Sequence, residues 1–307
     1  MNNLKKILIV SLLASQVLLL FACRKDNSYN TEPILNQTIL DRIYSLETEN
    51  NIIINYYDAP LNAQIDDKYI LSSNVEEIEA AVEAAEIIFS RFPENWAVTI
   101  SNSEVIIDES KKIEKVHIVF CESIEADEDK YGSEYLVKGN YYTDDNEIYY
   151  LIDIHNYEPK VAISETLIYR IVRKKAVDDD LEIEVMGDDG YRDIRIENSI
   201  IRRYTSYNPE GFDYYGYISE IRDEDKQYVY GSADDLNSVY FVNAEALYSE
   251  YIDLVQTVSP LLYTDKEEGL PEVYQSEYIK SKAISAISSI NDAFFFRGVE
   301  YLSSWFE

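Results

Sequence analysis

Short apolar runs separated by polar segments dominate the first half of the chain, and two segments there have helical spacing. Residues 52–57 are β-branched and aromatic, which favours a strand. After Asn74, whose side chain suits an N-cap, apolar residues recur every three or four positions until Pro93. The pattern predicts helices at residues 39–46 and from Asn74 to Pro93, and strands at residues 52–57, 97–101, 104–107, 115–120, 134–142 and 147–154. The last two strands flank the polar segment 143–146, which predicts a hairpin-like turn.

The second half of the chain has a mainly helical pattern. Residues 161–176 place apolar side chains on one face and end in three consecutive cations, which suit the negative end of a helix dipole. An acidic segment at 178–191 is expected to be a loop, and further helices are expected at residues 194–204, 234–256 and 276–304. We therefore expect an α+β fold, with a strand-rich N-terminal half, a core helix and a helical C-terminal subdomain.

The N-terminus has the features of an export signal with a lipid anchor. Two lysines precede an apolar stretch at 7–21 that is too short to cross a bilayer of roughly 30 Å as a helix. The stretch leads into Leu-Phe-Ala-Cys, which resembles a bacterial lipobox, in which the cysteine becomes lipidated. We expect residues 1–22 to be a signal peptide, Cys23 to carry lipid, and residues 23–36 to be a tether. An ordinary signal peptide with a coincidental cysteine is the alternative.

The charge balance argues against one class of partner. The chain has 58 Asp and Glu residues against 27 Lys and Arg residues, a formal net charge of −31. Nucleic-acid binding needs clustered Lys and Arg to neutralise phosphates, so we do not expect nucleic acid as a partner. The same balance argues against docking onto anionic lipid through a basic surface. Hydrophobic residues, at 46%, are abundant enough for a sizeable core.

Few residues are available for disulfide or metal chemistry. Beyond Cys23 only Cys121 remains, so no intrachain disulfide framework is expected. Cys121 ends an apolar run, which predicts a buried side chain. His117 and His155 are the two histidines of the chain; His117 lies within the expected strand at 115–120, and His155 lies at the end of the expected strand at 147–154. We expect both to be packed or hydrogen-bonded, because a metal site usually needs three or four convergent ligands.

Two further features have an ordinary structural explanation. The acidic segment 127–132 resembles the start of a calcium loop, but Tyr131 and Lys138 stand where oxygen ligands are needed, so we expect a solvated loop. Tyrosine occurs 28 times, often in adjacent pairs such as Tyr149 and Tyr150. Adjacent strand residues face opposite sides, so we expect a sheet packed on both faces. Outward rings that stack on sugars or anchor an interface are the alternative.

The order of these segments resembles that of one family, the zinc metallohydrolase lipoproteins associated with starch-utilisation-type outer-membrane importers. The resemblance runs through the chain at low similarity. It includes the strand at 52–57, the capped helix after Asn74, and a strand at 148–154 that leads through Tyr-Glu-Pro into a helix. It also includes Gly-Tyr-Ile-Ser at 216–219 and Ala-Asp-Asp-Leu at 233–236. The family fold resembles the zincin metallopeptidases, so the resemblance implies a zincin-like α+β fold.

The family's active-site helix carries His-Glu-x-x-His, in which two histidines bind zinc and the glutamate activates a zinc-bound water. By the resemblance, Ser164, Glu165 and Ile168 occupy these three positions. Serine is a poor zinc ligand and isoleucine cannot be one. The downstream acidic ligand aligns near Ser238. The resemblance therefore implies a degenerate site that has lost its zinc, with Glu165 either a relict general base or an ordinary polar residue of the helix.

The expected protein is a surface lipoprotein with a dismantled zinc site. The resemblance implies a pseudoenzyme that acts as a non-catalytic accessory or binding protein of an importer for glycan or peptide nutrients. It also implies importer components as partners and a place at the outer membrane, on the cell surface, held by lipid on Cys23. An active metallohydrolase with other ligands and an unrelated glycan-binding module are the alternatives. We expect an N-terminal α/β subdomain at 37–160, and a core helix with the helical subdomain at 161–307.

Overall fold

The computed structural model describes residues 35–57, 61, 68–102, 112–125, 138–144, 146–179, 181–186, 192–197, 199–215, 221–231, 236–294 and 300–307. Several expectations fall outside these residues: the leader at 1–22, Cys23, most of the tether, the strand at 104–107, and the segments 127–132, 216–219 and 233–235. No helix in the described part of the chain is long and apolar enough to cross a membrane.

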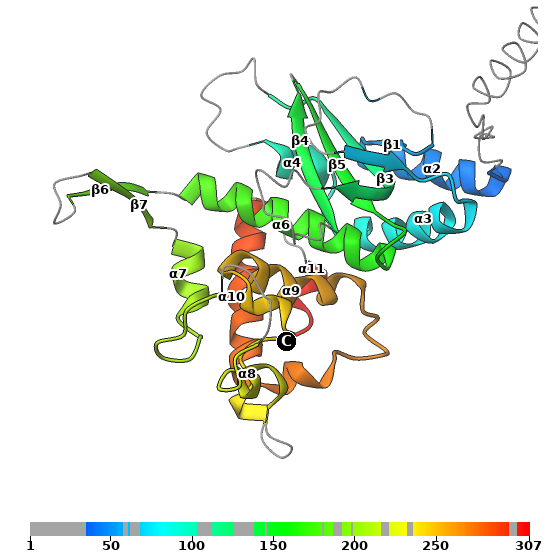
Figure 1. Cartoon of the computed structure of the whole chain (residues 1–307). Helices are drawn as coiled ribbons and strands as arrows, with labels where there is room; N and C mark the ends of the chain where they lie inside the picture. The colour runs from blue at the N-terminus through cyan, green and yellow to red at the C-terminus, as the bar shows by residue number, and fades with distance from the viewer. Residues whose placement is uncertain are drawn as a thin grey trace, which may run out of the picture. The chain divides into compact units, whose positions relative to one another are not determined.

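A mixed sheet forms one layer of the fold (Figure 1). Three parallel strands, β1 (Ile53–Asn55), β3 (Lys115–Glu125) and β5 (Glu147–Asp153), lie side by side with β3 in the middle. At one edge, β4 (Gly139–Asp144) pairs antiparallel with β5, and β2 (Lys68–Leu71) pairs antiparallel with the end of β3. The predicted hairpin is confirmed, because β4 pairs antiparallel with β5 and Asp144 lies opposite Glu147.

Two helices of the N-terminal half begin at asparagine caps. Asn36 accepts a hydrogen bond from a first-turn backbone N–H (3.0 Å) at the start of α2 (Gln37–Asn50). Asn74 does the same (3.0 Å) for α3 (Val75–Phe89), so the predicted cap is confirmed. The apolar stripe of α3 is buried, and it includes Ile78, Ala81, Val82, Ala85, Ile88 and Phe89.

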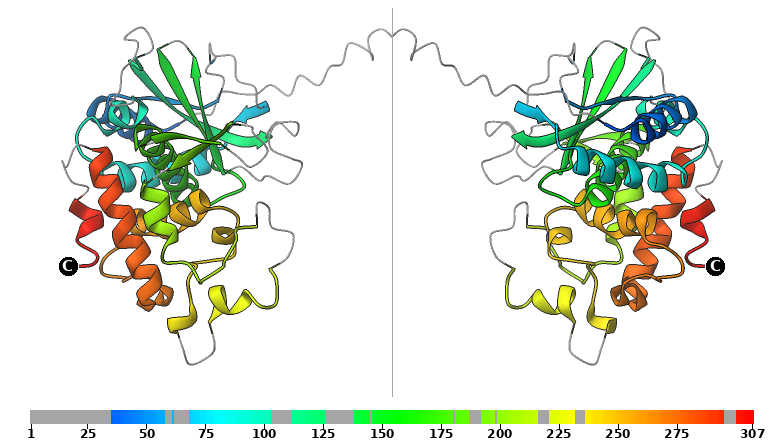
Figure 2. Two further views of the ribbon diagram at one scale, coloured as in Figure 1. Left: turned by 90° about the vertical axis from the view of Figure 1, so that its left-hand side faces the viewer. Right: turned by 90° about the vertical axis from the view of Figure 1, so that its right-hand side faces the viewer.

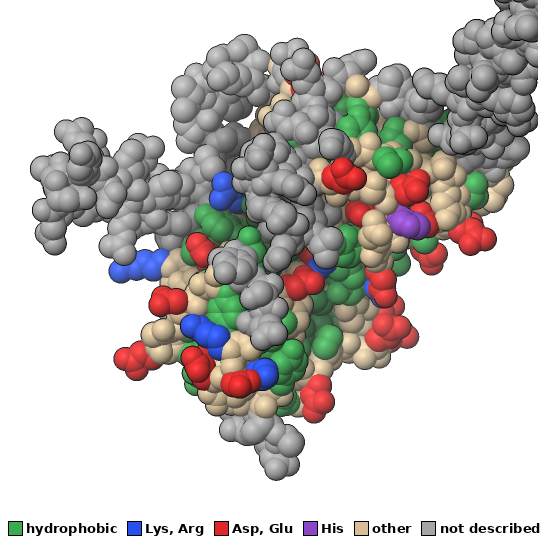
Figure 3. Space-filling model, viewed as in Figure 1, with side chains coloured by type: hydrophobic (Ala, Val, Ile, Leu, Met, Phe, Trp, Pro, Cys, Tyr) green, Lys and Arg blue, Asp and Glu red, His purple; other side chains and the backbone are tan. Residues whose placement is uncertain are grey.

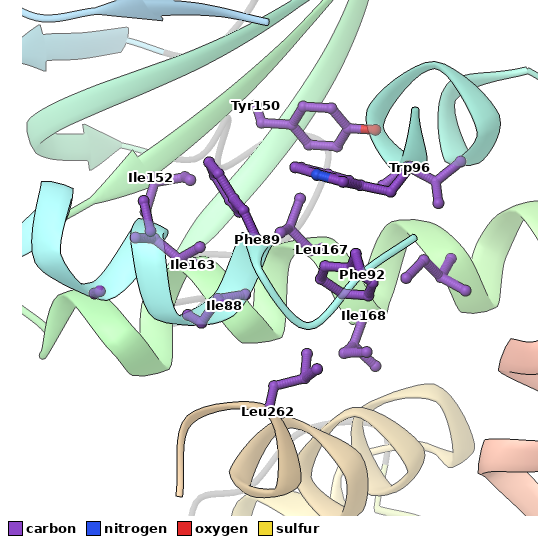
Figure 4. Close-up of a cluster of buried hydrophobic side chains, with 14 of the residues drawn as sticks. Ile88, Phe89, Phe92, Trp96, Tyr150, Ile152, Ile163, Leu167, Ile168 and Leu262 are labelled. Carbon is purple, nitrogen blue, oxygen red and sulfur yellow. The ribbon is translucent and has the colours of Figure 1, made fainter. Parts of the chain in front are cut away.

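The helix α6 (Pro159–Asp179) lies between the sheet and the C-terminal helices. Ile163, Leu167 and Ile171 are fully or almost fully buried, as the sequence predicts. Figure 4 shows Leu167 on the side of α6 that faces the sheet and Ile168 on the side that faces the C-terminal helices. One continuous apolar core therefore runs from the sheet, through α3 and α6, into the C-terminal part.

The C-terminal part is helical, and its central helix is α9 (Glu250–Tyr263), which packs against α6 and α10 (Glu277–Ala293). Figure 2 shows α9 and α10 on the same side of α6, away from the sheet. Where one helix was predicted at 276–304, the described residues form two, α10 and α11 (Glu300–Ser303), so the helical character is confirmed but not the single helix. Together with the strand-rich N-terminal half, this arrangement confirms the predicted α+β fold.

Residues 97–101 form a helix, so the strand predicted there is wrong. In α4 (Trp96–Ser101), the side chains of Trp96, Ala97 and Ile100 are buried together, as expected for one helix face. Asn95 adopts a left-handed conformation (φ 61°) just before the helix and turns the chain into it. A short apolar run has the same composition in a buried strand and in a buried helix, and here the tertiary packing decides between them.

The chain after α6 forms a hairpin in place of the predicted loop at 178–191. The strands β6 (Leu181–Met186) and β7 (Arg192–Glu197) pair antiparallel with each other. The predicted helix at 194–204 is also wrong in its first half, because only α7 (Ser199–Thr205) is helical. The pairing of β6 with β7 joins two separate segments of the chain, so the periodicity within either segment does not predict the hairpin.

The predicted helix at 234–256 is wrong over most of its length. The segment contains two short 3-10 turns, η2 (Leu236–Ser238) and η3 (Glu245–Leu247), and α9 starts only afterwards. The α9 start is set by Ser249, whose side chain accepts a hydrogen bond from a first-turn N–H (3.3 Å). The single long helix is thus replaced by two 3-10 helices, η2 and η3, and by the later α-helix α9.

Candidate functional site

The two positions aligned with zinc-binding histidines are turned into the protein core. Residues four apart share a face of a helix, and Ser164 and Ile168 are both 0% exposed. The Ser164 hydroxyl donates a hydrogen bond to the backbone carbonyl of Val161 (3.1 Å), one turn earlier in α6. Figure 4 shows Ile168 among other buried apolar side chains, including Leu262 of α9. These side chains do not fit a zinc ion.

The third predicted position, Ser238, lies at the end of η2. Its neighbour Val239 has a carbonyl that accepts a hydrogen bond from Ser276 Oγ (2.5 Å), just before α10. This stretch of chain is therefore tied to the start of α10. Among the residues that the structure describes, no three His, Cys, Asp or Glu side chains are grouped so that they could hold a metal ion.

Glu165 lies on a different face of α6 and is held in an ion pair. The ammonium of Lys138 is 3.0 Å from both Glu165 carboxylate oxygens. The same ammonium is 2.6 Å from a carboxylate oxygen of Glu245. The side chains of Lys138 and Glu165 are only 16% and 13% exposed, whereas that of Glu245 is 57% exposed. One cation therefore bridges a nearly buried carboxylate and an exposed one.

Amide and aromatic side chains surround this ion pair. Gln256 of α9 donates a hydrogen bond to Glu245 (3.1 Å), and Asn243 donates one to Gln256 (2.7 Å). The ring of Tyr157 lies 5.9 Å from the Lys138 ammonium. We call Lys138, Glu165, Glu245, Gln256 and Tyr157 the Lys138 cluster. It joins the start of β4, the helix α6, the η3 turn and α9.

The electrostatics of the cluster favour a charged lysine. Burial lowers the pKa of Lys138, but the charges and hydrogen bonds of Glu165 and Glu245 outweigh this, so its pKa lies above the ordinary value. Burial raises the pKa of Glu165, and the nearby Lys138 ammonium only partly counteracts it. No local pattern predicts this pairing, because Lys138 and Glu165 are 27 positions apart in the chain.

A second polar group lies where β5 ends. Asp153 is buried, and its carboxylate accepts hydrogen bonds from the backbone N–H groups of His155 (3.1 Å) and Asn156 (2.8 Å). The His155 ring is 2.7 Å from the Glu77 carboxylate in the first turns of α3. This contact raises the pKa of His155. The predicted hydrogen-bonded state of His155 is thus confirmed.

His117 is packed inside the sheet, also as predicted. Its Nδ1 is 2.9 Å from the Asn55 side chain, and its ring stacks on Tyr149 at 4.3 Å. Its Nε2 is 3.3 Å from a Glu147 oxygen, although without the geometry of a hydrogen bond. Burial lowers the pKa of His117, and the charge of Glu147 only partly offsets this.

The sheet is packed on both faces, as the tyrosine pairs predict. Tyr150 belongs to the main core, whereas Tyr149 packs with Val119, Cys121 and Leu151 on the opposite face. Both tyrosines are buried, at 0% and 2% exposed. Cys121 is also buried, and burial raises the pKa of its thiol to about 12, so it is an unreactive apolar side chain.

Acidic side chains are scattered over the described surface in Figure 3, with few basic ones among them. This distribution agrees with the net charge of −31. No described face in this view has the dense Lys and Arg that contacts to phosphate need.

Comparison with protein-family models found no match, and comparison with curated proteins found none either. Among solved structures, the chain matches a crystal structure of a protein from Bacteroides caccae ATCC 43185 that is provisionally described as a zinc-binding metallo-peptidase. The sequence identity is 10% and the TM-score is 0.43, over 88% of this chain and 92% of that chain.

Proposed function

We propose that this protein is a non-catalytic binding or accessory protein, in which apolar packing and an ion pair stand where the resembling family has a zinc site. The observation that carries the proposal is the burial of Ser164 and Ile168 at 0% exposure. Metal-assisted hydrolysis needs ligand atoms that converge on an open position for water. Neither side chain offers such an atom. The Ser164 hydroxyl is hydrogen-bonded to a backbone carbonyl of its own helix, and the Ile168 side chain is a hydrocarbon.

The state of Glu165 supports the same proposal. As a general base, this carboxylate would have to face a polarised water. Instead, the Lys138 ammonium lies 3.0 Å from both of its oxygens. The Lys138 ammonium neutralises this carboxylate, and neither Ser164 nor Ile168 on the same helix offers a zinc ligand.

The cellular setting in this proposal comes from the sequence. The lipobox-like leader supports an exported lipoprotein anchored through Cys23. The resemblance to importer-associated lipoproteins supports a place at the outer membrane, on the cell surface, beside importer components. The substrate of such an importer would be a glycan or a peptide.

Elemental analysis of the purified protein tests the loss of zinc directly. We expect no stoichiometric zinc, and no hydrolysis of a generic protein substrate such as casein. The double variant Ser164→His/Ile168→His should gain little zinc affinity. Both positions point into a packed core, where a larger side chain typically costs about 1–3 kcal/mol.

About one zinc per unmodified chain, together with hydrolysis that disappears in Glu165→Gln, would overturn the proposal. That result would favour the alternative of an active metallohydrolase that uses other ligands, since catalytic zinc needs three protein ligands and a water. Glu165→Asp serves as the matched control, because it keeps the carboxylate.

A further inference from the structure

Two arginines of α6 have no carboxylate partner in the described part of the chain. Arg170 and Arg173 are three positions apart, so they lie on the same face of the helix, and both are partly buried. Neither guanidinium forms an ion pair with a described Asp or Glu, whereas Arg42 is paired with Glu86 (2.7 Å). Like charges this close on one helix repel each other, so an anion beside them would be stabilising.

The partners of Arg170 are neutral groups. Its Nη2 donates a hydrogen bond to the Ser101 carbonyl (3.1 Å), and its guanidinium carbon lies 4.8 Å from the centre of the Tyr141 ring. The guanidinium also hydrogen-bonds the hydroxyl of Tyr150. Its Nε is buried and has no hydrogen-bond partner among the described residues. A partly buried cation with an unused donor is unfavourable, and the arrangement indicates that an acceptor is missing.

Arg173 extends the positive charge of this face towards α9. Its guanidinium carbon lies 5.0 Å from the centre of the Tyr251 ring, in the first turn of α9. Burial lowers the pKa of Arg173, but its interactions with neighbouring tyrosines outweigh this, so its pKa lies above the ordinary value. These tyrosines are Tyr169, Tyr251 and Tyr141, and each is only partly buried. The two guanidiniums therefore lie among aromatic rings where β4, α6 and α9 meet.

We propose that Arg170 and Arg173 bind the carboxylate of an acidic sugar, a ligand that the net charge of −31 would otherwise repel. Guanidinium groups bind carboxylates through paired N–H donors, so such a ligand supplies both the missing acceptor and the missing charge. The tyrosine rings favour a sugar as the carrier of the carboxylate, because flat amphipathic rings can stack on sugar faces. The inference deepens the proposed function by naming the ligand class, and it rests on that function for binding without cleavage.

Calorimetric titration of the full chain with oligomers of galacturonate and of glucuronate tests this site. We expect binding of a uronate oligomer but not of its methyl ester, which keeps the sugar rings and lacks the charge. Arg170→Met and Arg173→Met should each weaken binding by about tenfold or more, as expected for the loss of a hydrogen bond between charged groups. Arg42→Met is the matched control: it removes a guanidinium that is already paired with Glu86, so it should leave the affinity unchanged.

A measurement on the unmodified protein keeps the test decisive if the α6 variants fold poorly. Phenylglyoxal modifies accessible arginines, and peptide mass spectrometry reports the extent at each one. The bound uronate oligomer should slow the modification of Arg173 several-fold and leave that of Arg42 unchanged.

Three outcomes would overturn the proposal. They are the absence of binding by the unmodified protein, equal binding of the methyl ester, and undiminished binding by folded Arg170→Met and Arg173→Met. Tighter binding of tetraglutamate than of either uronate oligomer would also overturn it, in favour of an acidic peptide. Zinc content and casein hydrolysis test the proposed function separately, so either idea can fail without the other.

Discussion

The ammonium of Lys282 and the carboxylate of Asp253 form an ion pair, 2.7 Å apart, in which both side chains are 0% exposed. The pair joins α10 to α9. Asp253 also accepts hydrogen bonds from the hydroxyls of Tyr204 (3.0 Å) and Tyr214 (2.8 Å). The carboxylate therefore collects donors from three separate segments of the C-terminal part.

The lysine of this pair is satisfied in the same way. Its ammonium donates to the backbone carbonyl of Tyr240 (2.9 Å) and lies 4.0 Å from the centre of the Phe241 ring. Burial raises the pKa of Asp253 and lowers that of Lys282, and the attraction between the two groups opposes both shifts. Since neither group can reach water, each depends on the other.

Lys282→Met should therefore strongly destabilise the protein. The substitution keeps much of the side-chain volume but leaves the Asp253 carboxylate buried without a cation. Loss of one partner of a buried pair typically costs about 3–5 kcal/mol. The free energy of unfolding from urea titration measures this cost.

Lys226→Met provides the control, because it breaks an exposed pair of similar length. Lys226 is 2.6 Å from Asp223, with side chains 54% and 94% exposed. Because both side chains face water, which screens their attraction, loss of this pair should change the stability little. Similar losses of stability in the two variants would show that water reaches Asp253 and that the pair is not a buried one.

Leu167→Ala tests the position of α6 between the sheet and α9. Leu167 is 0% exposed, so the change removes buried surface and leaves a cavity, at a cost of about 2–5 kcal/mol. Ile284→Ala is the control, since Ile284 is 47% exposed on α10 and its truncation should change stability by less than about 0.5 kcal/mol. A denaturation midpoint of Leu167→Ala equal to that of the unmodified protein would contradict this packing.

The pKa values of the two histidines should be shifted in opposite directions from the ordinary value of the imidazole. The hydrogen bond and charge of Glu77 raise the pKa of His155, whereas burial lowers the pKa of His117. NMR titration of the ring protons measures both, and His117→Gln assigns the signals because the chain has two histidines. Glu77→Gln should bring the pKa of His155 down towards the ordinary value and leave His117 unchanged.

The same shifts give opposite contributions to stability. The contribution of His155 is fully present below its unfolded pKa of about 6.5 and is lost as pH rises through the folded pKa. The depressed pKa of His117 means that the folded state resists protonation, so its contribution is lost as pH falls below about 6.5. If His155 titrates at or below His117, the pairing of His155 with Glu77 is wrong.

Cys23→Ser should release the protein from membranes. Lipid on this thiol is the expected anchor, and more than one acyl chain is needed for stable attachment. Partitioning between detergent and aqueous phases, with the unmodified protein as control, measures the effect. Continued membrane association of the variant would mean that the uncleaved leader or a protein partner holds the chain there.

Local patterns in the sequence determined the elements that can be predicted from the apolar positions of one continuous segment. The cap at Asn74 and the apolar stripe after it predicted α3, because side chains three and four apart share a helix face. The polar turn before Glu147 predicted the hairpin of β4 and β5. The burial of Ile163, Leu167 and Ile171 on α6 followed from the same periodicity.

Tertiary contacts decided the features that depend on distant residues. Residues 97–101 became a helix because Trp96 and Ile100 pack into one core, and β6 became a strand because β7 pairs with it. The side chain of Lys138 reaches Glu165 because the edge strand β4 packs closely against α6 at Gly139. Periodicity indicates which face of a segment is apolar. The partner of a buried charge is decided by the fold, because many acidic residues of the chain could have paired with Lys138.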